Sequence, residues 1–291
     1  MLAPSERYAH VRRQRHKKLT DWARQTLLQV ARWLPDREII AVADSSYAAI
    51  DLLNPARRHV CMITRLRLDA RLFDPPAPRR RGAIGRPRVI GCRQPTLAER
   101  LTNPRTRWLR LTVTGWYGRG ERQVEIASAT ALWHHPGRLV PIRYVLVREV
   151  AGEFKPQAFL CTNLAADPVD ILRWFVRRWS IEVTFAEVRR HLGVEAQRQW
   201  SDAAIARTTP ALLGLFSLIT LWANELSASA PSPRAASWYP KPLPTFRDAI
   251  AAVCRQLWLP DHFHRSRSAS DPRRMLRSTL NALVNVACYA A

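Results

Sequence analysis

The stretch from Asp167 to Gly193 constrains the fold more than any other part of the chain. Asp167 followed by Pro168 is a typical helix start, because Asp caps the first turn and Pro fits the first helical position. Gly193 supplies the left-handed residue that ends many helices. No helix breaker lies between them, so the sequence predicts one continuous helix. Its apolar residues at helical spacing form a stripe that must face a core: Trp174, Ile181, Phe185, Val188 and Leu192.

Beside that stripe, a narrow polar strip carries Arg178, Glu182 and Arg189, with Phe175 at its start. The far side of the strip is apolar again, with Trp179, Val183 and Ala186. A partly buried carboxylate between apolar flanks needs a partner or a metal ion. Two interpretations stay open at this point. Arg178 and Glu182 form a structural ion pair at i and i+4, or Glu182 holds a catalytic cation while the two arginines bind a phosphate.

The charge of the chain indicates a polyanionic partner. Its 46 Lys and Arg residues against 23 Asp and Glu residues give a net charge of +23, which favours nucleic acid. A membrane surface would also attract this charge, but the sequence lacks an uninterrupted apolar run of about 18 residues. The longest apolar run, Ala211 to Leu221, predicts a buried helix. The first twenty residues are basic without an apolar segment, which argues against a secretory signal.

Cysteine and histidine give little indication of a metal centre. The five cysteines are far apart and form no C-x-x-C pair, so we expect free thiols in a reducing cytoplasm and no structural zinc; they are Cys61, Cys92, Cys161, Cys254 and Cys288. The two histidine clusters, His134-His135 and His262 with His264, lack a carboxylate or cysteine at ligand spacing. Surface loops are therefore the favoured interpretation of both clusters.

The first sixty residues predict a helix, a strand and a second helix. A basic amphipathic helix is expected from Glu6 to Trp33, and Ile39 to Ala43 is an apolar run typical of a central strand. Asp44 follows this strand directly, and a helix begins at Tyr47. An acid at the carboxyl end of a central strand lies where ligands bind in open α/β sheets. The alternative for Asp44 is a plain helix N-cap.

The middle of the chain predicts an exposed loop and then a β-rich region. Residues 74–95 are rich in Pro, Gly and Arg and cannot pack a core. The arginines of this loop suggest an arm that enters a DNA minor groove, or a solvated loop without a fixed partner: Arg79, Arg80, Arg81 and Arg86. Strands, expected to be antiparallel, follow at 109–114, 123–130, 142–147 and 159–162, after an earlier strand at 60–68. This β-rich insertion separates Asp44 from the helix that carries Glu182.

The spacing of Phe175, Arg178, Glu182 and Arg189 resembles the Y-R-E-K signature of DDE transposases in the insertion-sequence four superfamily, with Phe for Tyr and Arg for Lys. The surrounding sequence is similar to that family beyond these four positions. Ala43 to Tyr47 resembles the strand end that carries the family's second Asp, and a β-rich insertion before the Glu is a further family trait. Together these features span the chain from Trp33 to Trp222.

The resemblance implies an α/β, RNase H-like catalytic core with a β-rich insertion and a helical C-terminal region. Asp44 and Glu182 would bind divalent cations, Mg²⁺ or Mn²⁺, for phosphoryl transfer on DNA; two ions about 4 Å apart would activate water or a 3′-hydroxyl. Arg178 and Arg189 would hold phosphates near the transposon end, and Phe175 would stack on a base. The partners implied are double-stranded DNA, namely terminal inverted repeats and target DNA, and a second copy in a homodimer, in the bacterial cytoplasm at the nucleoid.

The family's first Asp lies on a strand that precedes the helix expected from Glu6, and residues 1–5 are too short to supply it. We therefore expect an incomplete core that lacks its first strands, from a truncated or split reading frame, and an inactive isolated chain. The competing hypotheses are a DNA-binding fragment or inhibitor of full-length transposase, and a structural nucleoid-type protein. The expected organisation is a partial core at 1–60, a core strand and insertion at 61–166, core helices at 167–226, and linker and C-terminal helices at 227–291.

Overall fold

The computed structural model describes residues 6–79, 82, 84–114, 120–135, 138–149, 152, 154–196, 198, 201–226, 241, 243–262 and 277–290. The chain divides into two compact units, Met1–Ser180 and Ile181–Ala291. The boundary falls inside the region 167–226 that the sequence groups together. Each unit is described by itself below.

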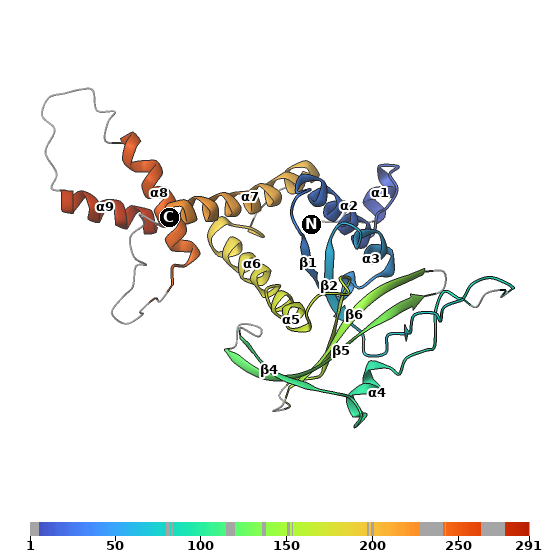
Figure 1. The fold of residues 1–291 in the computed structure, drawn as a ribbon. Helices are drawn as coiled ribbons and strands as arrows, with labels where there is room; N and C mark the ends of the chain where they lie inside the picture. The colour runs from blue at the N-terminus through green and yellow to red at the C-terminus, as the bar shows by residue number, and fades with distance from the viewer. Residues whose placement is uncertain are drawn as a thin grey trace, which may run out of the picture. The chain divides into compact units, whose positions relative to one another are not determined.

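In the described part of the first unit, seven strands form one mixed sheet (Figure 1). Its order is β1-β2-β7-β6-β5-β3, and β4 also pairs with β5. Only β1 and β2 are parallel; every other pairing is antiparallel. The strands are β1 (Ile40–Ala43), β2 (Cys61–Leu66), β3 (Leu72–Phe73), β4 (Leu109–Thr114), β5 (Glu121–His135), β6 (Arg138–Glu149) and β7 (Gln157–Cys161). The predicted antiparallel strands are confirmed, and the β2–β7 pairing joins them to the core strands in a single sheet.

Among the described helices of the first unit, α3 (Ile50–Ala56) and α5 (Pro168–Val176) pack against β1 and β2 from opposite faces of the sheet. The other helices described in this unit are α1 (Glu6–Val11), α2 (Leu19–Trp33), the 3₁₀ turn η1 (Ser45–Tyr47) and α4 (Leu97–Thr102). On β1, Ala41 and Ala43 pack into the core shared with α2 and α3, whereas Ile40 and Val42 pack into the core shared with α5. This alternation follows from the period of two along a strand. It explains why the run from Ile39 to Ala43 is apolar without interruption.

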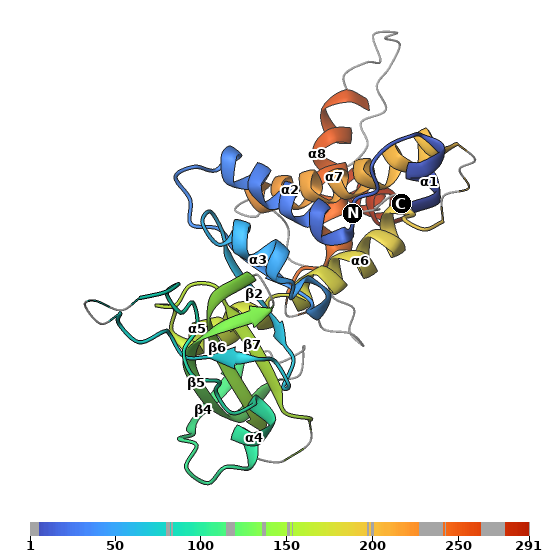
Figure 2. The ribbon, with the colours of Figure 1, turned by 90° about the vertical axis from the view of Figure 1, so that its right-hand side faces the viewer.

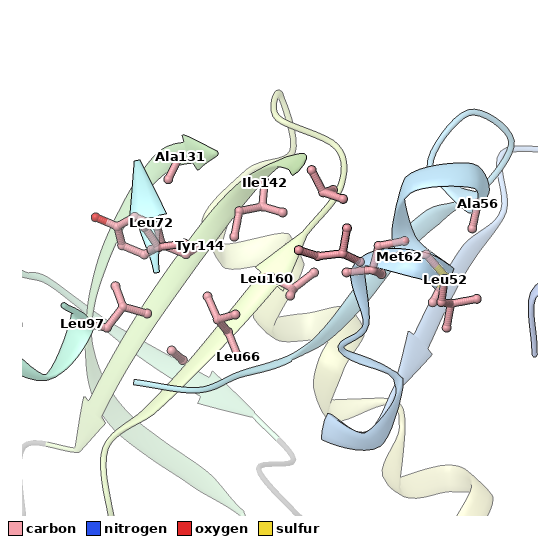
Figure 3. Close-up of a cluster of buried hydrophobic side chains, with 14 of the residues drawn as sticks. Leu52, Ala56, Met62, Leu66, Leu72, Leu97, Ala131, Ile142, Tyr144 and Leu160 are labelled. Carbon is pink, nitrogen blue, oxygen red and sulfur yellow. The ribbon is translucent and has the colours of Figure 1, made fainter. Parts of the chain in front are cut away.

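The larger of these cores lies between α3, α4 and one face of the sheet (Figure 3). Leu52 and Ala56 of α3 meet Met62 of β2, and Tyr144 of β6 packs beyond them near Leu97 of α4. These five side chains are at most 2% exposed. Burial of such side chains supplies the main driving force for folding of this unit.

The single helix predicted from Glu6 to Trp33 is wrong, because the structure has two helices there. Arg12 to Lys18 separate α1 from α2, and Arg13 adopts a positive φ of 52°. This run carries five Lys or Arg residues and one His, and like charges one turn apart destabilise a helix. The second helix starts where the side chain of Asp21 accepts a hydrogen bond from the Lys18 N–H at 3.1 Å.

The described part of the second unit is helical. It holds most of α6 (Trp179–Leu192), then α7 (Asp202–Leu226), α8 (Phe246–His262) and α9 (Arg277–Ala290), and α8 packs against both α7 and α9. The rings of Phe216 and Phe246 lie 4.5 Å apart between α7 and α8. Ala251, Val284 and Cys288 form the core between α8 and α9. Figure 2 shows α7 and α8 in a second view.

The prediction that Ala211 to Leu221 is a buried helix is wrong. Leu215, Leu218, Leu221 and Trp222 of α7 are each between 42% and 62% exposed. Among the described residues, Ala206–Leu226 is also the one segment long and apolar enough to cross a membrane by length and composition alone.

A polar network joins α8 to α9 through Asp248, which is 8% exposed. Its carboxylate accepts hydrogen bonds from the Thr245 N–H at 2.8 Å, the Thr245 hydroxyl at 2.7 Å, the Tyr289 hydroxyl at 2.9 Å and the Lys241 ammonium at 3.3 Å. Burial alone would raise the pKa of Asp248, but these donors outweigh it and lower the pKa to about 2. The ionised carboxylate is therefore part of the native packing.

We expect the second unit to lose stability in acid because of this carboxylate. Its pKa is lower in the folded state than the ordinary value of 3.8, so the stabilisation is complete above about pH 5 and disappears as the pH falls towards 2. The shift corresponds to about 2 kcal/mol at neutral pH. Asp248→Asn should remove this part of the pH dependence in urea unfolding followed at pH 7, 5 and 3. Glu225→Gln, at an exposed position of α7, is the control; an equal change in both variants would contradict the assignment.

Candidate functional site

Asp44 stands at the carboxyl end of β1, as predicted, and begins the 3₁₀ turn η1. The prediction that this strand is central is wrong, because β1 is an edge strand of the described sheet. The Oδ1 atom of Asp44 accepts a hydrogen bond from the Ser45 N–H at 2.8 Å, and its backbone carbonyl accepts one from the Tyr47 N–H at 3.0 Å. The side chain is exposed. Within the described residues, its second oxygen, Oδ2, makes no hydrogen bond. Asp44 therefore caps a turn and still presents one carboxylate oxygen to a ligand.

The sheet holds Asp44 in place through the neighbouring parallel strand. Ala43, directly before it, is paired with Thr64 of β2, which is fully buried. Beyond Thr64, the chain continues into Arg65, whose backbone carbonyl accepts a hydrogen bond from the Thr64 hydroxyl at 3.4 Å. Asp44 and Arg65 thus directly follow two paired residues of the parallel strands, which places a carboxylate and a guanidinium-bearing residue near the carboxyl end of β1, where ligands bind in α/β proteins.

The continuous helix predicted from Asp167 to Gly193 is wrong, since a turn at Arg177 and Arg178 divides it into α5 and α6. At this turn the N–H of Arg178 bonds the carbonyl of Phe175, and the N–H of Ser180 bonds that of Arg177, both at 3.0 Å. These are i to i+3 bonds, which wind the backbone more tightly than an α-helix. The Ser180 hydroxyl also donates to the Arg177 carbonyl at 2.7 Å. Both helix ends are as predicted: Asp167 caps α5 through the Val169 N–H at 2.7 Å, and Gly193 has a φ of +71°.

Phe175 and Arg178, two of the predicted DNA-binding residues, belong to the first unit. Phe175 is 2% exposed, and its ring centroid lies 4.2 Å from that of Phe159 on β7. The guanidinium of Arg178 lies 6.0 Å from the Phe175 ring centroid, at the limit of a cation–π contact. The structure therefore gives Phe175 a packing role. Its stacking on a base stays a prediction that requires the ring to leave this core.

Glu182 and Arg189 lie on the part of α6 that belongs to the second unit. Glu182 is exposed in the first turn of α6, where a negative charge is favourable next to the helix N-terminus. The expectation of a partly buried carboxylate is wrong, because Ile181 and Val183 beside it are 49% and 50% exposed. Arg189 forms an exposed ion pair with Glu195 at 2.6 Å. The pKa of Arg189 is raised first by the hydrogen bond to Glu195 and to a lesser extent by the charge of Glu182.

Most of the described residues of the arginine-rich loop are exposed, as predicted, and hydrogen bonds join the two ends of the loop. The Asp74 N–H bonds the Cys92 carbonyl and the Gly91 N–H bonds the Asp74 carbonyl, both at 2.8 Å. Gly91 has no room for a side chain, since a Cβ there would lie 2.5 Å from the carbonyl oxygen of Pro75. Arg79 donates to the Gly85 carbonyl at 3.1 Å, and Arg86 is exposed. Arg80 and Arg81 lie outside the described residues.

The described residues contain no group of three or more His, Cys, Asp or Glu side chains that would hold a metal ion. Mg²⁺ is often bound by one or two carboxylates together with water and substrate phosphates. The carboxylate of Asp44 is therefore a suitable type of ligand for this ion. Glu182 belongs to the other unit. The meeting of Asp44 and Glu182 at one cation therefore stays a prediction.

Sequence reasoning missed a charged cluster on the curved part of the sheet. Glu125 of β5 lies opposite Arg110 of β4 and opposite Arg148 of β6, and it accepts hydrogen bonds from Arg110 at 3.1 Å and from Arg148 at 2.9 Å. These bonds lower the pKa of Glu125. Arg148 also stacks over the ring of Trp108 at 4.0 Å. Residues of opposite charge on neighbouring strands could have indicated this cluster. Recognising them as partners, however, requires knowing which residues of the strands are paired.

The first unit is a mixed α/β structure, and an acidic side chain, Asp44, directly follows its strand β1. Residues 2–123 match a family model described as DDE superfamily endonuclease. This match supports a DDE transposase-type family for the matched part of the chain, and it includes Asp44 but ends before Glu182. No curated protein matches the chain.

Proposed function

We propose that the chain is a transposase of the insertion-sequence type, which binds double-stranded DNA and takes Mg²⁺ or Mn²⁺ at Asp44 and Glu182. The observation that carries this proposal is the placement of Asp44, an exposed carboxylate at the end of β1 within the residues that match the endonuclease family. The net charge of +23 supports a DNA substrate. The Y-R-E-K resemblance around Glu182 supports the second carboxylate.

In this proposal the chain's own residues bind and orient the DNA. Arg178 and Arg189 would hold phosphates at the transposon end, and Arg79, Arg80, Arg81 and Arg86 would contact the duplex from the loop. Asp44 and Glu182 would hold the cation, which when bound stabilises negative charge on the phosphate oxygens during strand cleavage and transfer. The protein would act as a homodimer in the bacterial cytoplasm, at the nucleoid.

We further propose that the core of this chain is incomplete, so that it binds DNA without cutting it. The open edge of β1 supports this idea. Among the described strands, β1 pairs only with β2, so the N–H and C=O groups on its other side face no strand. Its side chains contact apolar cores on both faces, although all four are only partly buried. A strand from a full-length transposase would fit this edge, which favours the role of an inhibitor as the second candidate function.

A cleavage assay on the full chain tests whether the chain is inactive, and it tests the two carboxylates if cleavage is seen. The substrate is a labelled duplex carrying the ends of the element, incubated with Mg²⁺ or Mn²⁺ at equal DNA occupancy. We expect binding without cleavage for the wild-type chain. Glu182→Gln should leave the DNA affinity unchanged or higher, because it removes a negative charge near the phosphates.

The outcomes separate the alternatives. Cleavage by the wild-type chain that is abolished by Asp44→Asn and by Glu182→Gln would overturn the inactive state and support both carboxylates. Cleavage that survives both substitutions would instead exclude these two residues as the metal site. Arg67→Ala is a suitable control, because Arg67 is already paired with Asp69 through two hydrogen bonds of 2.8 and 2.7 Å.

A further inference from the structure

Two cysteines that are distant in the sequence lie in contact on adjacent strands of the first unit. The Sγ atoms of Cys61 on β2 and Cys161 on β7 are 3.4 Å apart, although 100 positions separate the residues. The strands are antiparallel, with Ile63 opposite Cys161. Cys61 is two positions from Ile63, so Cys61 and Cys161 project from the same face of the sheet. Both side chains belong to the core that contains Phe159 and Phe175.

The two thiols differ in access and in acidity. Cys161 is fully buried, whereas Cys61 is only partly buried. The hydrogen bond between the sulfurs lowers the pKa of Cys61 more than burial raises it. The same hydrogen bond, together with burial, raises the pKa of Cys161. Either sulfur can be the donor of this hydrogen bond, and Cys61 is the more accessible of the two thiols, so an external disulfide reaches Cys61 first.

We propose that Cys61 and Cys161 form a reversible disulfide site that reacts with small-molecule disulfides such as oxidised glutathione. The two sulfurs, 3.4 Å apart, must approach by about 1.4 Å to reach a disulfide bond length, and because Cys61 lies diagonal to Cys161 in the strand register, the strands must shift slightly to close the bond. Disulfides in reducing compartments are usually transient or redox-sensing. The site is independent of the proposed DNA chemistry and needs neither Asp44 nor Glu182.

The reaction proceeds by two thiol–disulfide exchanges. The Cys61 thiolate attacks one sulfur of oxidised glutathione; a mixed disulfide forms at Cys61, and one glutathione thiolate leaves and takes up a proton. Cys161 then loses its proton and attacks the Sγ of Cys61. The protein disulfide forms and the second glutathione leaves. Both protein thiols are oxidised and one glutathione disulfide is reduced to two thiols, so atoms and electrons balance.

Peptide mapping of the full chain tests this proposal. The folded protein is incubated with oxidised glutathione, its remaining thiols are blocked with N-ethylmaleimide in denaturant, and the digest is analysed by mass spectrometry. We expect a cross-linked peptide joining Cys61 to Cys161, lighter by about 2 Da than the two reduced peptides and absent after dithiothreitol. Exposed Cys92 should carry a glutathione adduct instead. The proposal is overturned if Cys92 is modified while Cys61 and Cys161 both remain fully alkylatable.

Single substitutions test the order of the two steps. Cys161→Ala should trap the adduct at Cys61, so that the mixed disulfide accumulates at least tenfold over the wild-type level. Cys92→Ser is the matched control and should leave the cross-link unchanged. Equal accumulation of the Cys61 adduct in the wild type and in Cys161→Ala would contradict a resolving role for Cys161. Circular dichroism checks folding, and Cys161→Ser is the second variant if Cys161→Ala fails to fold; the wild-type mapping does not depend on either.

Discussion

Phe175→Ala should lower the free energy of unfolding by about 3–5 kcal/mol, which is the usual cost of removing a large aromatic side chain from a packed core. Phe175 is 2% exposed and its ring packs on that of Phe159. The substitution removes this contact and the buried apolar surface of the ring, and leaves a cavity between α5 and β7. Urea unfolding of the full chain, followed by tryptophan fluorescence, measures the effect.

Two further substitutions make this experiment specific to burial. Phe175→Leu keeps most of the apolar volume, so it should cost clearly less than Phe175→Ala. Ile181→Ala removes a side chain that is 49% exposed and should change stability by less than about 1 kcal/mol. A loss below 1 kcal/mol for Phe175→Ala, combined with a large loss of DNA affinity, would contradict the packing role and favour the predicted stacking on a base.

The affinity of the chain for duplex DNA should fall about 10³–10⁵-fold between 50 and 200 mM salt. Each phosphate that an arginine or lysine neutralises releases bound counterions, and six to ten such contacts give a loss of this size. The net charge of +23 provides more than enough cationic groups. Fluorescence anisotropy with a labelled duplex at several salt concentrations gives the slope of log affinity against log salt.

The change of this slope in single variants then shows which arginines contact a phosphate. Arg86→Ala should reduce its magnitude by about 0.9 if Arg86 contacts one phosphate. Arg67→Ala should leave the slope unchanged, because the neighbouring carboxylate of Asp69 already compensates the charge of Arg67. An affinity that hardly depends on salt would argue against backbone binding altogether. A steep slope without preference for the ends of the element would favour the structural nucleoid-type protein.

Much of the strand pattern was predictable from local sequence. The predicted strand at 109–114 coincides with β4, and the apolar run from Ile39 followed by Asp44 coincides with β1 and its end. In both places, alternation or continuous apolar character matches the period of a strand. Helix α4 was missed, although Thr96 and Glu99 form a capping box whose two hydrogen bonds measure 3.2 and 2.9 Å. A short helix with a strong cap has too few residues to show a helical period.

The site was harder to predict because it depends on the path of the backbone between elements. The 100° spacing that placed Phe175, Arg178 and Glu182 on one strip assumes an unbroken helix, and the turn at Arg177 and Arg178 ends that regularity. No residue there is a helix breaker. The burial of Phe175 against Phe159 is a tertiary contact across more than ten residues, and such contacts override local helix propensity.

The pairing of β2 with β7 has a consequence for how the chain matures during synthesis. β2 ends at Leu66, whereas its antiparallel partner β7 begins at Gln157. At about 5–20 residues per second, a ribosome needs roughly 5–20 s to add the 100 residues between Cys61 and Cys161. During that interval the nascent β1–β2 pair, with apolar residues on both faces, lacks β7, the other strand that pairs with β2. The early part of this protein therefore leaves the β7-facing edge of β2 unpaired until translation delivers β7.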